Sequence, residues 1–258
     1  MTATPDKFTR QIVQSVQPWA ANLFSLRCSR DPGFRFRPGQ FARLGVSKAD
    51  GSVVWRAYSM VSAPHDDFLE FFSILVPDGE FSTVLSQMQP GAGLLVERQA
   101  YGFLTLDRFA DGEDLWLLAT GTGLAPFLSM LQDPEVWQRF ARIKLVYSVR
   151  HARELAYLEL IRGLTARDYL AEFAGRLQFI ALLSREQAPG CLHGRLTTLL
   201  DSGELERAAG LTLDPARSRL MLCGNPQMIE DMQARLKHRG MQLSLSRRPG
   251  QLALENYW

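Results

Sequence analysis

The pattern of hydrophobic residues changes near residue 107, and this change constrains the fold more than any other feature of the chain. Before it, short alternating or β-branched and aromatic runs are separated by clusters of Gly and Pro. Closely spaced strands with such turns predict an antiparallel barrel or sandwich, interrupted by one helix at about 82–89. The runs that carry this prediction are 22–28, 53–60 and 68–76.

Beyond residues 111–112 the apolar runs become continuous and alternate with helical patterns at 127–131 and about 154–164. Strands buried on both faces and alternating with helices predict a parallel sheet. We therefore expect two domains, an antiparallel β-barrel over residues 1–106 and an α/β parallel-sheet domain over residues 107–258. The apolar runs of the second domain are 115–119, 143–149, 177–183 and 219–223.

Composition excludes several classes of protein. The net charge of +2 over 258 residues is too small to suggest a nucleic-acid binder, and no apolar run could span a bilayer. The first residues lack a signal-peptide pattern, and the cysteines form no CxxC, so we expect a cytoplasmic protein without a metal site. The scattered cysteines are Cys28, Cys191 and Cys223.

Gly121-Thr122-Gly123 follows an apolar strand and precedes a helix with Pro126 near its first turn. Glycines let the backbone approach a pyrophosphate, and the start of the helix supplies free N–H groups. A plain tight turn between strand and helix would look the same. Proline at 126 also means that the usual dinucleotide fingerprint is absent.

Two segments of the first half are candidate cofactor contacts. In Arg56-Ala57-Tyr58-Ser59, Arg56 and Tyr58 share one face of a strand, and Ser59 points the other way unless the strand ends there. Asp78 to Thr83 runs from a turn into a helix that Ser82 or Thr83 could cap. A half-solvated strand and an ordinary capped helix are the alternatives.

Two features of the second half point to a nucleotide. The segment from Cys223 to Met228 ends a strand and opens the last long helix, which places Cys223 at the same sheet edge as Gly121. A buried small thiol before an ordinary helix start is the alternative. Arginines that follow strand ends could clamp a 2′-phosphate, which favours NADP over NAD, although solvated helix starts would look similar. These are Arg150, Arg185 and Arg195.

The chain ends in Glu255-Asn256-Tyr257-Trp258, with two large aromatic residues in last place. Such rings could stack on a flat ligand or simply dock in a groove.

Taken in order, these segments and 36–41, 221–228 and 247–250 resemble the ferredoxin/flavodoxin–NADP(+) reductases, most closely the bacterial subclass that ends in Tyr-Trp. The resemblance covers nearly the whole chain. It implies an FAD-binding barrel followed by an NADP-binding domain in a monomeric enzyme, with hydride exchanged with NADPH and single electrons exchanged with ferredoxin or flavodoxin. In plastid-type members the aromatic residue is the last one, whereas here Trp258 extends past it.

The resemblance also implies a role for individual residues. Arg56 would meet the FAD phosphates, Tyr58 and Tyr257 would cover the two flavin faces, and Trp258 would stack on adenine. The expected catalytic residues are Ser59, Cys223, Glu255 and Tyr257. The expected FAD contacts are Arg56, Ala57, Tyr58, Ser59, Gly79, Glu80, Phe81, Ser82, Thr122, Tyr257 and Trp258. The expected NADP contacts are Gly121, Thr122, Gly123, Arg150, Arg185, Arg195, Cys223, Gly224, Pro226 and Met228.

Two other functions stay open at this point. One is a non-catalytic nucleotide-binding regulatory module, and the other is an NAD(P)H reductase component that serves a different acceptor. A reductase with its own iron–sulfur centre is not expected, because the chain has no cysteine cluster.

Overall fold

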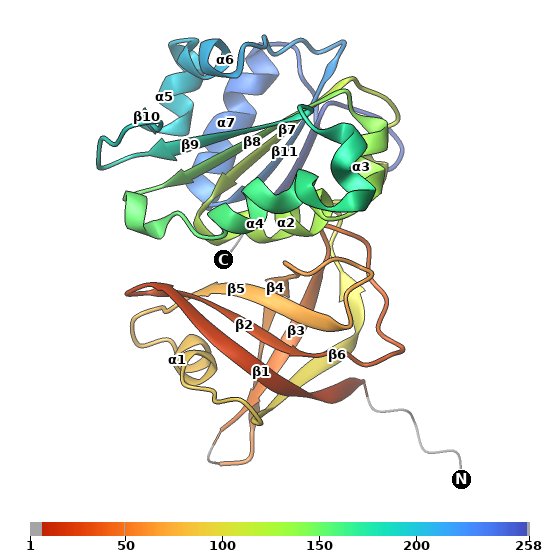
Figure 1. Ribbon diagram of the computed structural model, residues 1–258, viewed down its shortest axis with the longest axis vertical. Coiled ribbons are helices and arrows are strands. Elements are labelled where there is room, and N and C mark those ends of the chain that lie inside the picture. Colours follow the sequence, from red (N-terminus) through yellow and green to blue (C-terminus); the bar gives the residue numbers. More distant parts are fainter. Residues whose placement is uncertain (1–6, 49, 257–258) are drawn as a thin grey trace.

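The computed structural model describes residues 7–48 and 50–256. In these residues the chain forms two six-stranded sheets, stacked one above the other in Figure 1. The lower sheet is antiparallel and the upper one is parallel. The predicted fold class, an antiparallel barrel followed by an α/β parallel-sheet domain, is therefore confirmed.

The first sheet has the strand order β4-β3-β6-β1-β2-β5. An antiparallel bridge between Met60, just after β4, and Phe71 in β5 joins the two outer strands, so the sheet closes into a barrel. Alternation along the strands sends side chains such as Leu26, Leu44 and Val96 into its core. The strands are β1 (Phe8–Ala20), β2 (Leu23–Ser29), β3 (Phe41–Ser47), β4 (Val53–Ser59), β5 (Phe68–Ile74) and β6 (Gly93–Tyr101).

The second sheet has the strand order β10-β9-β8-β7-β11-β12, with every neighbouring pair parallel. The order reverses between β7 and β11, because β8 to β10 lie on one side of β7 and β11 and β12 on the other. Ligands of such sheets bind outside the carboxyl ends of the strands at this point of reversal. The strands are β7 (Asp114–Thr120), β8 (Arg142–Val149), β9 (Leu177–Leu183), β10 (Leu192–His193), β11 (Ser218–Gly224) and β12 (Leu252–Asn256).

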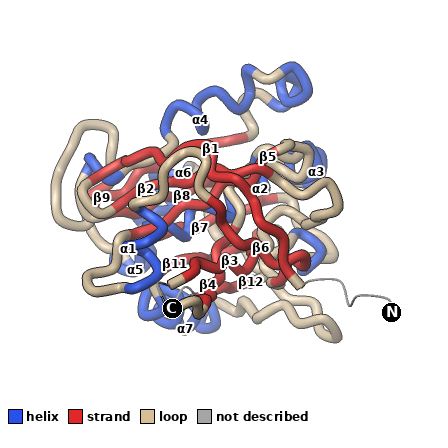
Figure 2. Tube along the Cα trace, turned by 90° about the horizontal axis from the view of Figure 1, so that it is seen from below, coloured by secondary structure: helices blue, strands red, loops and turns tan. Residues whose placement is uncertain are grey.

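Helices cover both faces of the parallel sheet, and Figure 2, seen from the barrel end, shows α3, α4, α5 and α7 around the strands. One core packs α2 to α4 on the sheet, and another packs α5 to α7 on the opposite face. The helices are α1 (Glu80–Ser86), α2 (Ala125–Leu131), α3 (Pro134–Arg139), α4 (Leu158–Gly163), α5 (Leu196–Asp201), α6 (Glu204–Ala209) and α7 (Pro226–His238). Short 3₁₀ helices are η1 (Leu106–Arg108), η2 (Gly121–Leu124), η3 (Ala152–Glu154), η4 (Leu164–Ala166) and η5 (Asp168–Phe173).

Two helix predictions need correction. The helix expected at about 82–89 begins earlier, at Glu80, and the single helix expected at about 154–164 is broken. Tyr157 has a left-handed backbone with φ 61°, which separates η3 from α4. A residue with a left-handed backbone cannot continue a right-handed helix. The hydrophobic pattern therefore overestimates the length of this helix.

The two domains share a packed interface. Leu23, Val61 and Phe72 of the barrel belong to the same core as α2 of the second domain. Buried polar groups cross the interface as well, because Ser129 Oγ donates to the Ser62 carbonyl at 2.7 Å and Gln132 Nε2 donates to the Val61 carbonyl at 2.8 Å. The second domain thus packs directly on the loop that follows β4.

Among the residues that the structure describes, no helix is long and apolar enough to cross a membrane.

Candidate functional site

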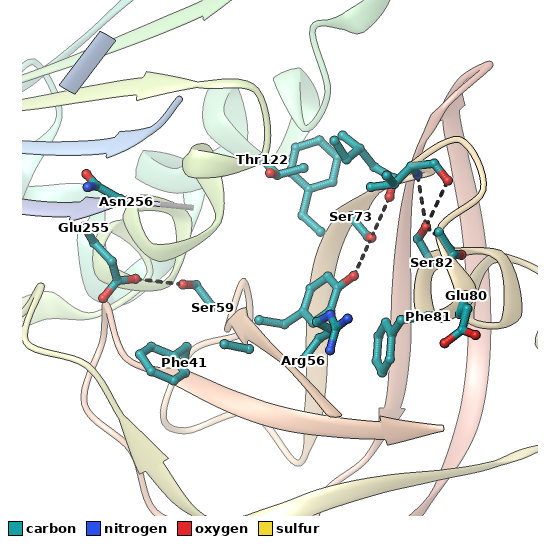
Figure 3. Close-up of a pocket in the computed structure, with 16 residues that line it drawn as sticks. Phe41, Arg56, Ser59, Ser73, Glu80, Phe81, Ser82, Thr122, Glu255 and Asn256 are labelled. Carbon is teal, nitrogen blue, oxygen red and sulfur yellow. Dashed lines mark hydrogen bonds between the residues drawn. The ribbon is translucent and has the colours of Figure 1, made fainter. Parts of the chain in front are cut away.

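A cavity of about 510 Å³ lies at the junction of the two domains (Figure 3). Barrel strands, the turn before α1, the glycine turn after β7 and the end of β12 all contribute to its wall. Its lining residues are Phe41, Arg56, Ala57, Tyr58, Ser59, Phe72, Ser73, Ile74, Val76, Gly79, Glu80, Phe81, Ser82, Thr122, Glu255 and Asn256. Every expected FAD contact within the described residues lines this one cavity.

Strand β4 supplies a cation, an aromatic ring and a hydroxyl to the cavity. Tyr58 stacks on Phe81 with ring centroids 5.6 Å apart, and its hydroxyl lies 3.1 Å from Ser73 Oγ. Burial raises the pKa of Tyr58, so the ring stays neutral. Arg56 is exposed, and Ser59 is the last residue of the strand. Because the strand ends at Ser59, this side chain can face the same cavity as its neighbours.

The turn before α1 presents its backbone to the cavity. A β-carbon at Gly79 would lie 2.9 Å from both Ser82 Oγ and the β-carbon of Val76, so the turn has no room for a side chain. The prediction that Ser82 or Thr83 caps the helix is wrong: Gly79 is the residue at the cap position, and within the described chain no side chain caps α1. Ser82 Oγ instead accepts a 3.0 Å hydrogen bond from the Val76 amide, which holds the turn closed.

A hydrogen bond across the domain junction joins Ser59 to the C-terminal strand. Ser59 Oγ donates to Glu255 Oε1 at 3.3 Å, although the two residues are 196 positions apart in sequence (Figure 3). Burial raises the pKa of Glu255 to about 7, and the bond from Ser59 opposes that rise. A carboxyl group that titrates near neutrality in a cavity is a candidate proton donor and acceptor.

The glycine turn after β7 brings Thr122 to the cavity wall. Gly121 has φ 54°, and the turn forms η2 before α2, with Pro126 near the first position of the helix as expected. Gly123 has a different physical role. A β-carbon there would lie 2.2 Å from the Cys223 carbonyl oxygen, so glycine is required by the close approach of β11.

Cys223 and Glu255 are paired in register on the neighbouring strands β11 and β12. The Cys223 side chain is fully buried, and it does not line the cavity. After it, Gly224 has φ 132° and packs against Thr120, while Asn225 caps α7 by accepting from the Met228 amide at 3.1 Å. Of the expected contacts, Gly224 therefore ends β11, and Pro226 and Met228 lie in the first turn of α7.

The three predicted phosphate-clamping arginines lie on adjacent loops at the carboxyl ends of β8, β9 and β10. Arg150, Arg185 and Arg195 are all exposed. The Arg185 amide donates to the Arg150 carbonyl at 3.0 Å, which ties the first two loops together. Within the described ranges, none of the three guanidinium groups forms an ion pair. They lie outside the cavity that gathers the FAD contacts.

The predicted site residues and the residues of the cavity wall overlap only in part. Tyr257 and Trp258, expected to cover the flavin and adenine, lie outside the described residues. Sequence reasoning missed several residues of the cavity wall, although Phe41 ends the 36–41 segment that supports the family resemblance. The missed lining residues are Phe41, Phe72, Ser73, Ile74, Val76 and Asn256.

The wall residues suit a flat ligand that carries phosphates. Aromatic side chains of Phe41, Tyr58 and Phe72 can contact a ring system, while Arg56 and the backbone at Gly79 can approach an anion. The cavity volume falls in the range of cofactor pockets. The cavity lies beside the point where the strand order of the parallel sheet reverses. A nucleotide bound at that sheet edge could therefore reach the ring system of the ligand in the cavity.

Comparisons with known proteins agree with this arrangement. An oxidoreductase FAD-binding domain model matches residues 14–99, and an oxidoreductase NAD-binding domain model matches residues 117–234. The fold, the cavity and these two models define an oxidoreductase that combines a flavin with a nicotinamide nucleotide.

Two curated relatives show which family of flavin- and nicotinamide-dependent oxidoreductases the chain resembles. The chain is 41% identical over 251 residues to ferredoxin–NADP reductase A of Sorangium cellulosum, covering 96% of this chain and 89% of that protein. It is 43% identical over 247 residues to the flavodoxin/ferredoxin–NADP reductase of Escherichia coli K12, covering 95% and 97%. The chain belongs to the ferredoxin/flavodoxin–NADP reductase family.

The solved structures include a ferredoxin NADP+ reductase from Neisseria gonorrhoeae with bound FAD and NADP. Its TM-score to this chain is 0.91 at 38% identity, and the match covers 98% of this chain and 99% of that one. The architecture therefore extends over the whole length of both proteins.

Proposed function

We propose that this chain binds FAD and NADPH and exchanges electrons between NADPH and ferredoxin or flavodoxin. The observation that best supports this function is the hydrogen bond between Ser59 and Glu255. It joins the barrel side of the cavity to the carboxyl ends of the parallel strands. The names of the relatives support the same pair of substrates. We also propose a domain boundary near residue 107.

The barrel residues would hold FAD. Arg56 would neutralise phosphate charge, Tyr58 would lie against the ring system, and the backbone from Gly79 to Ser82 would receive the pyrophosphate. The exposed guanidinium of Arg56 and the bare backbone of the turn at Gly79 both support these roles. Tyr257 and Trp258 would contact the flavin and adenine from the C-terminal end.

The second domain would present the nicotinamide nucleotide. Gly121 to Gly123 and the start of α7 would approach the pyrophosphate, and Arg150, Arg185 and Arg195 would bind the 2′-phosphate. Three guanidinium groups on adjacent loops, none of them in an ion pair with another described residue, support this phosphate site. Cys223 and Glu255, paired on neighbouring strands, would lie beside the nicotinamide.

The bound FAD would supply the redox chemistry, since it accepts electrons in pairs and releases them singly, while the protein supplies position and electrostatics. Each NADPH oxidised to NADP+ and H+ would reduce two one-electron carriers. Glu255, with its pKa near 7 and its bond from Ser59, would hold or release a proton at this junction. We further propose that the enzyme works as a cytoplasmic monomer.

Reduction rates with NADPH and NADH test this function. The wild type should reduce a ferredoxin or a flavodoxin with NADPH far faster than with NADH. Arg185→Ala combined with Arg195→Ala should remove most of this preference, because charge-assisted bonds to phosphate are worth about 1.5–3 kcal/mol each. A matched control is Arg207→Ala, on the exposed side of α6. An unchanged preference in the double variant would reject the phosphate site.

A further inference from the structure

Glu186 lies among the three loops that carry the arginines of the proposed 2′-phosphate site, and the proposed function gives this residue no role. It directly follows Arg185 in the loop after β9. Its side chain is 40% exposed, so the carboxylate is neither free in solvent nor part of the core. Contacts from this one residue reach the loop after β8 and the end of β10.

The carboxylate of Glu186 is bound by the loop after β8. Its Oε2 accepts a 3.0 Å hydrogen bond from the Ala152 amide, and His151 Nδ1 lies 3.5 Å from the same oxygen. Both contacting residues follow directly after Arg150 in the chain. The Glu186 side chain therefore joins the loop that carries Arg185 to the loop that carries Arg150.

The backbone of Glu186 makes the connection to the third arginine. His193 Nδ1 lies 2.8 Å from the Glu186 carbonyl oxygen. A carbonyl oxygen can only accept a hydrogen bond, so Nδ1 carries the proton and donates it. His193 ends β10, just before Gly194 and Arg195. Each of the three arginines is thus close in sequence to a group that bonds to Glu186 or belongs to it.

Backbone hydrogen bonds fix the point where these loops leave the sheet. The Arg185 amide donates to the Arg150 carbonyl at 3.0 Å, and the Gly194 amide donates to the Leu183 carbonyl at 3.0 Å. The contacts of Glu186 add a side-chain link to this frame. A phosphate is bound more tightly when its donors are already in place, because less freedom is lost on binding.

A carboxylate beside an anion site would by itself oppose the binding of phosphate, since like charges repel. Within the part of the chain that the structure describes, Glu186 forms no ion pair with any of the three arginines. Its charge is directed at the Ala152 amide and at His151 instead. The three guanidinium groups thus keep their charge for a ligand, and the contacts of the carboxylate point to a role in holding the loops.

We propose that Glu186 is a positioning residue that sets the preference for a nucleotide with a 2′-phosphate, an inference that rests on the proposed function. Glu186 would touch neither the phosphate nor the reacting atoms. It would hold the three arginine loops at a spacing at which their guanidinium groups can meet one phosphate. A nucleotide without the 2′-phosphate would gain nothing from this arrangement.

The test compares KM and kcat for NADPH and NADH in Glu186→Ala and Glu186→Gln, with ferricyanide as a small electron acceptor. Glu186→Ala should raise the KM for NADPH by about tenfold, with little change in the KM for NADH or in kcat. Glu186→Gln keeps an oxygen that can accept from the Ala152 amide, so its KM for NADPH should lie much closer to the wild-type value. The sign of the effect is decisive, because loss of a negative charge beside a phosphate would by itself lower this KM.

His193→Ala tests the third loop without removing a carboxylate. The Glu186 carbonyl then loses its donor, so the KM for NADPH should rise while the KM for NADH stays near the wild-type value. The matched control is Glu172→Ala, which removes one exposed negative charge from η5, at the other edge of the sheet before β9. Both KM values of this control should equal those of the wild type.

A lower KM for NADPH in both Glu186 variants would show that the residue acts through its charge alone, and this would overturn the proposal. An equal rise of the KM for NADPH and for NADH would overturn it as well, because a general disturbance of the domain has that effect. If the wild type prefers NADPH and Glu186→Ala keeps the full preference, only the positioning role is rejected. If the wild type uses NADPH and NADH equally well, the 2′-phosphate site of the proposed function is itself wrong.

Discussion

The Tyr157 hydroxyl donates a 2.8 Å hydrogen bond to Glu70 Oε1, and this buried bond joins the parallel-sheet domain to the barrel. The Tyr157 ring packs between Trp19 and Phe72, with centroid distances of 4.6 and 5.1 Å. The other carboxylate oxygen of Glu70 accepts from Arg27 at 2.8 Å. Since Phe72 also lines the cavity, this contact fixes the second domain against one wall of the site.

Replacing Tyr157 with Phe should lower the free energy of unfolding by about 1–3 kcal/mol, because a buried carboxylate oxygen loses its donor. Urea denaturation measures this change. Tyr169→Phe serves as the control, since Tyr169 is 43% exposed and water can replace its partners. Equal, small effects in the two variants would show that the Tyr157–Glu70 bond does not stabilise the domain junction.

The stability of the protein should depend on Glu255 between about pH 4.5 and 7. Burial raises the pKa of this carboxyl from 4.5 to about 7, so the folded state binds a proton that the unfolded state has released. The contribution of Glu255 to stability is therefore fully present below its unfolded pKa and is lost as the pH rises through 7. The total loss should be on the order of 3 kcal/mol. Glu255→Gln should remove this part of the pH dependence of unfolding, and a variant with the wild-type profile would contradict the assignment.

Ser59→Ala should raise the pKa of Glu255 further. The hydroxyl donates to the carboxylate and stabilises its charged form, so its removal favours the protonated form. The pH-dependent fall in stability should then move to higher pH than in the wild type. Ser73→Ala is a suitable control, because Ser73 lines the same cavity but bonds to Tyr58. A downward shift in Ser59→Ala would mean that the contact does not act on the charged form.

The two glycines of the turn after β7 should respond differently to alanine. Gly123→Ala would place a β-carbon 2.2 Å from the Cys223 carbonyl oxygen, so β11 would have to shift, at a cost of about 3 kcal/mol or more. Gly121→Ala meets nothing within 4 Å and bears only the strain of a left-handed backbone, about 1–2 kcal/mol. Thermal or urea unfolding of both variants measures the difference. A larger loss in Gly121→Ala would contradict the close packing of the two strands.

The sequence predicted most of the fold because its strongest signals are local. The apolar runs at 143–149 and 177–183 are β8 and β9 almost residue for residue. The helix expected at about 154–164 was wrong because hydrophobic spacing does not reveal the left-handed Tyr157. The start of α1 was placed late because Ser82 bonds to the Val76 amide rather than capping the helix.

The site was harder to predict than the fold. Residues of the Arg56–Ser59 segment and of the turn at Gly79 could be found because each combines a short motif with a position at a strand or helix end. The contact between Ser59 and Glu255 depends on how two domains pack, and no local pattern encodes it. Likewise, the close approach behind Gly123 comes from the neighbouring strand, whereas the sequence suggested either a phosphate turn or a plain tight turn.

The absorption spectrum of the purified protein tests the central claim most directly. If the cavity at the domain junction holds FAD beside the nicotinamide site, the protein should be yellow, show a flavin spectrum, and bleach without oxygen when NADPH is added. A colourless protein that takes up no FAD, or a bound flavin that NADPH leaves oxidised, would contradict the account.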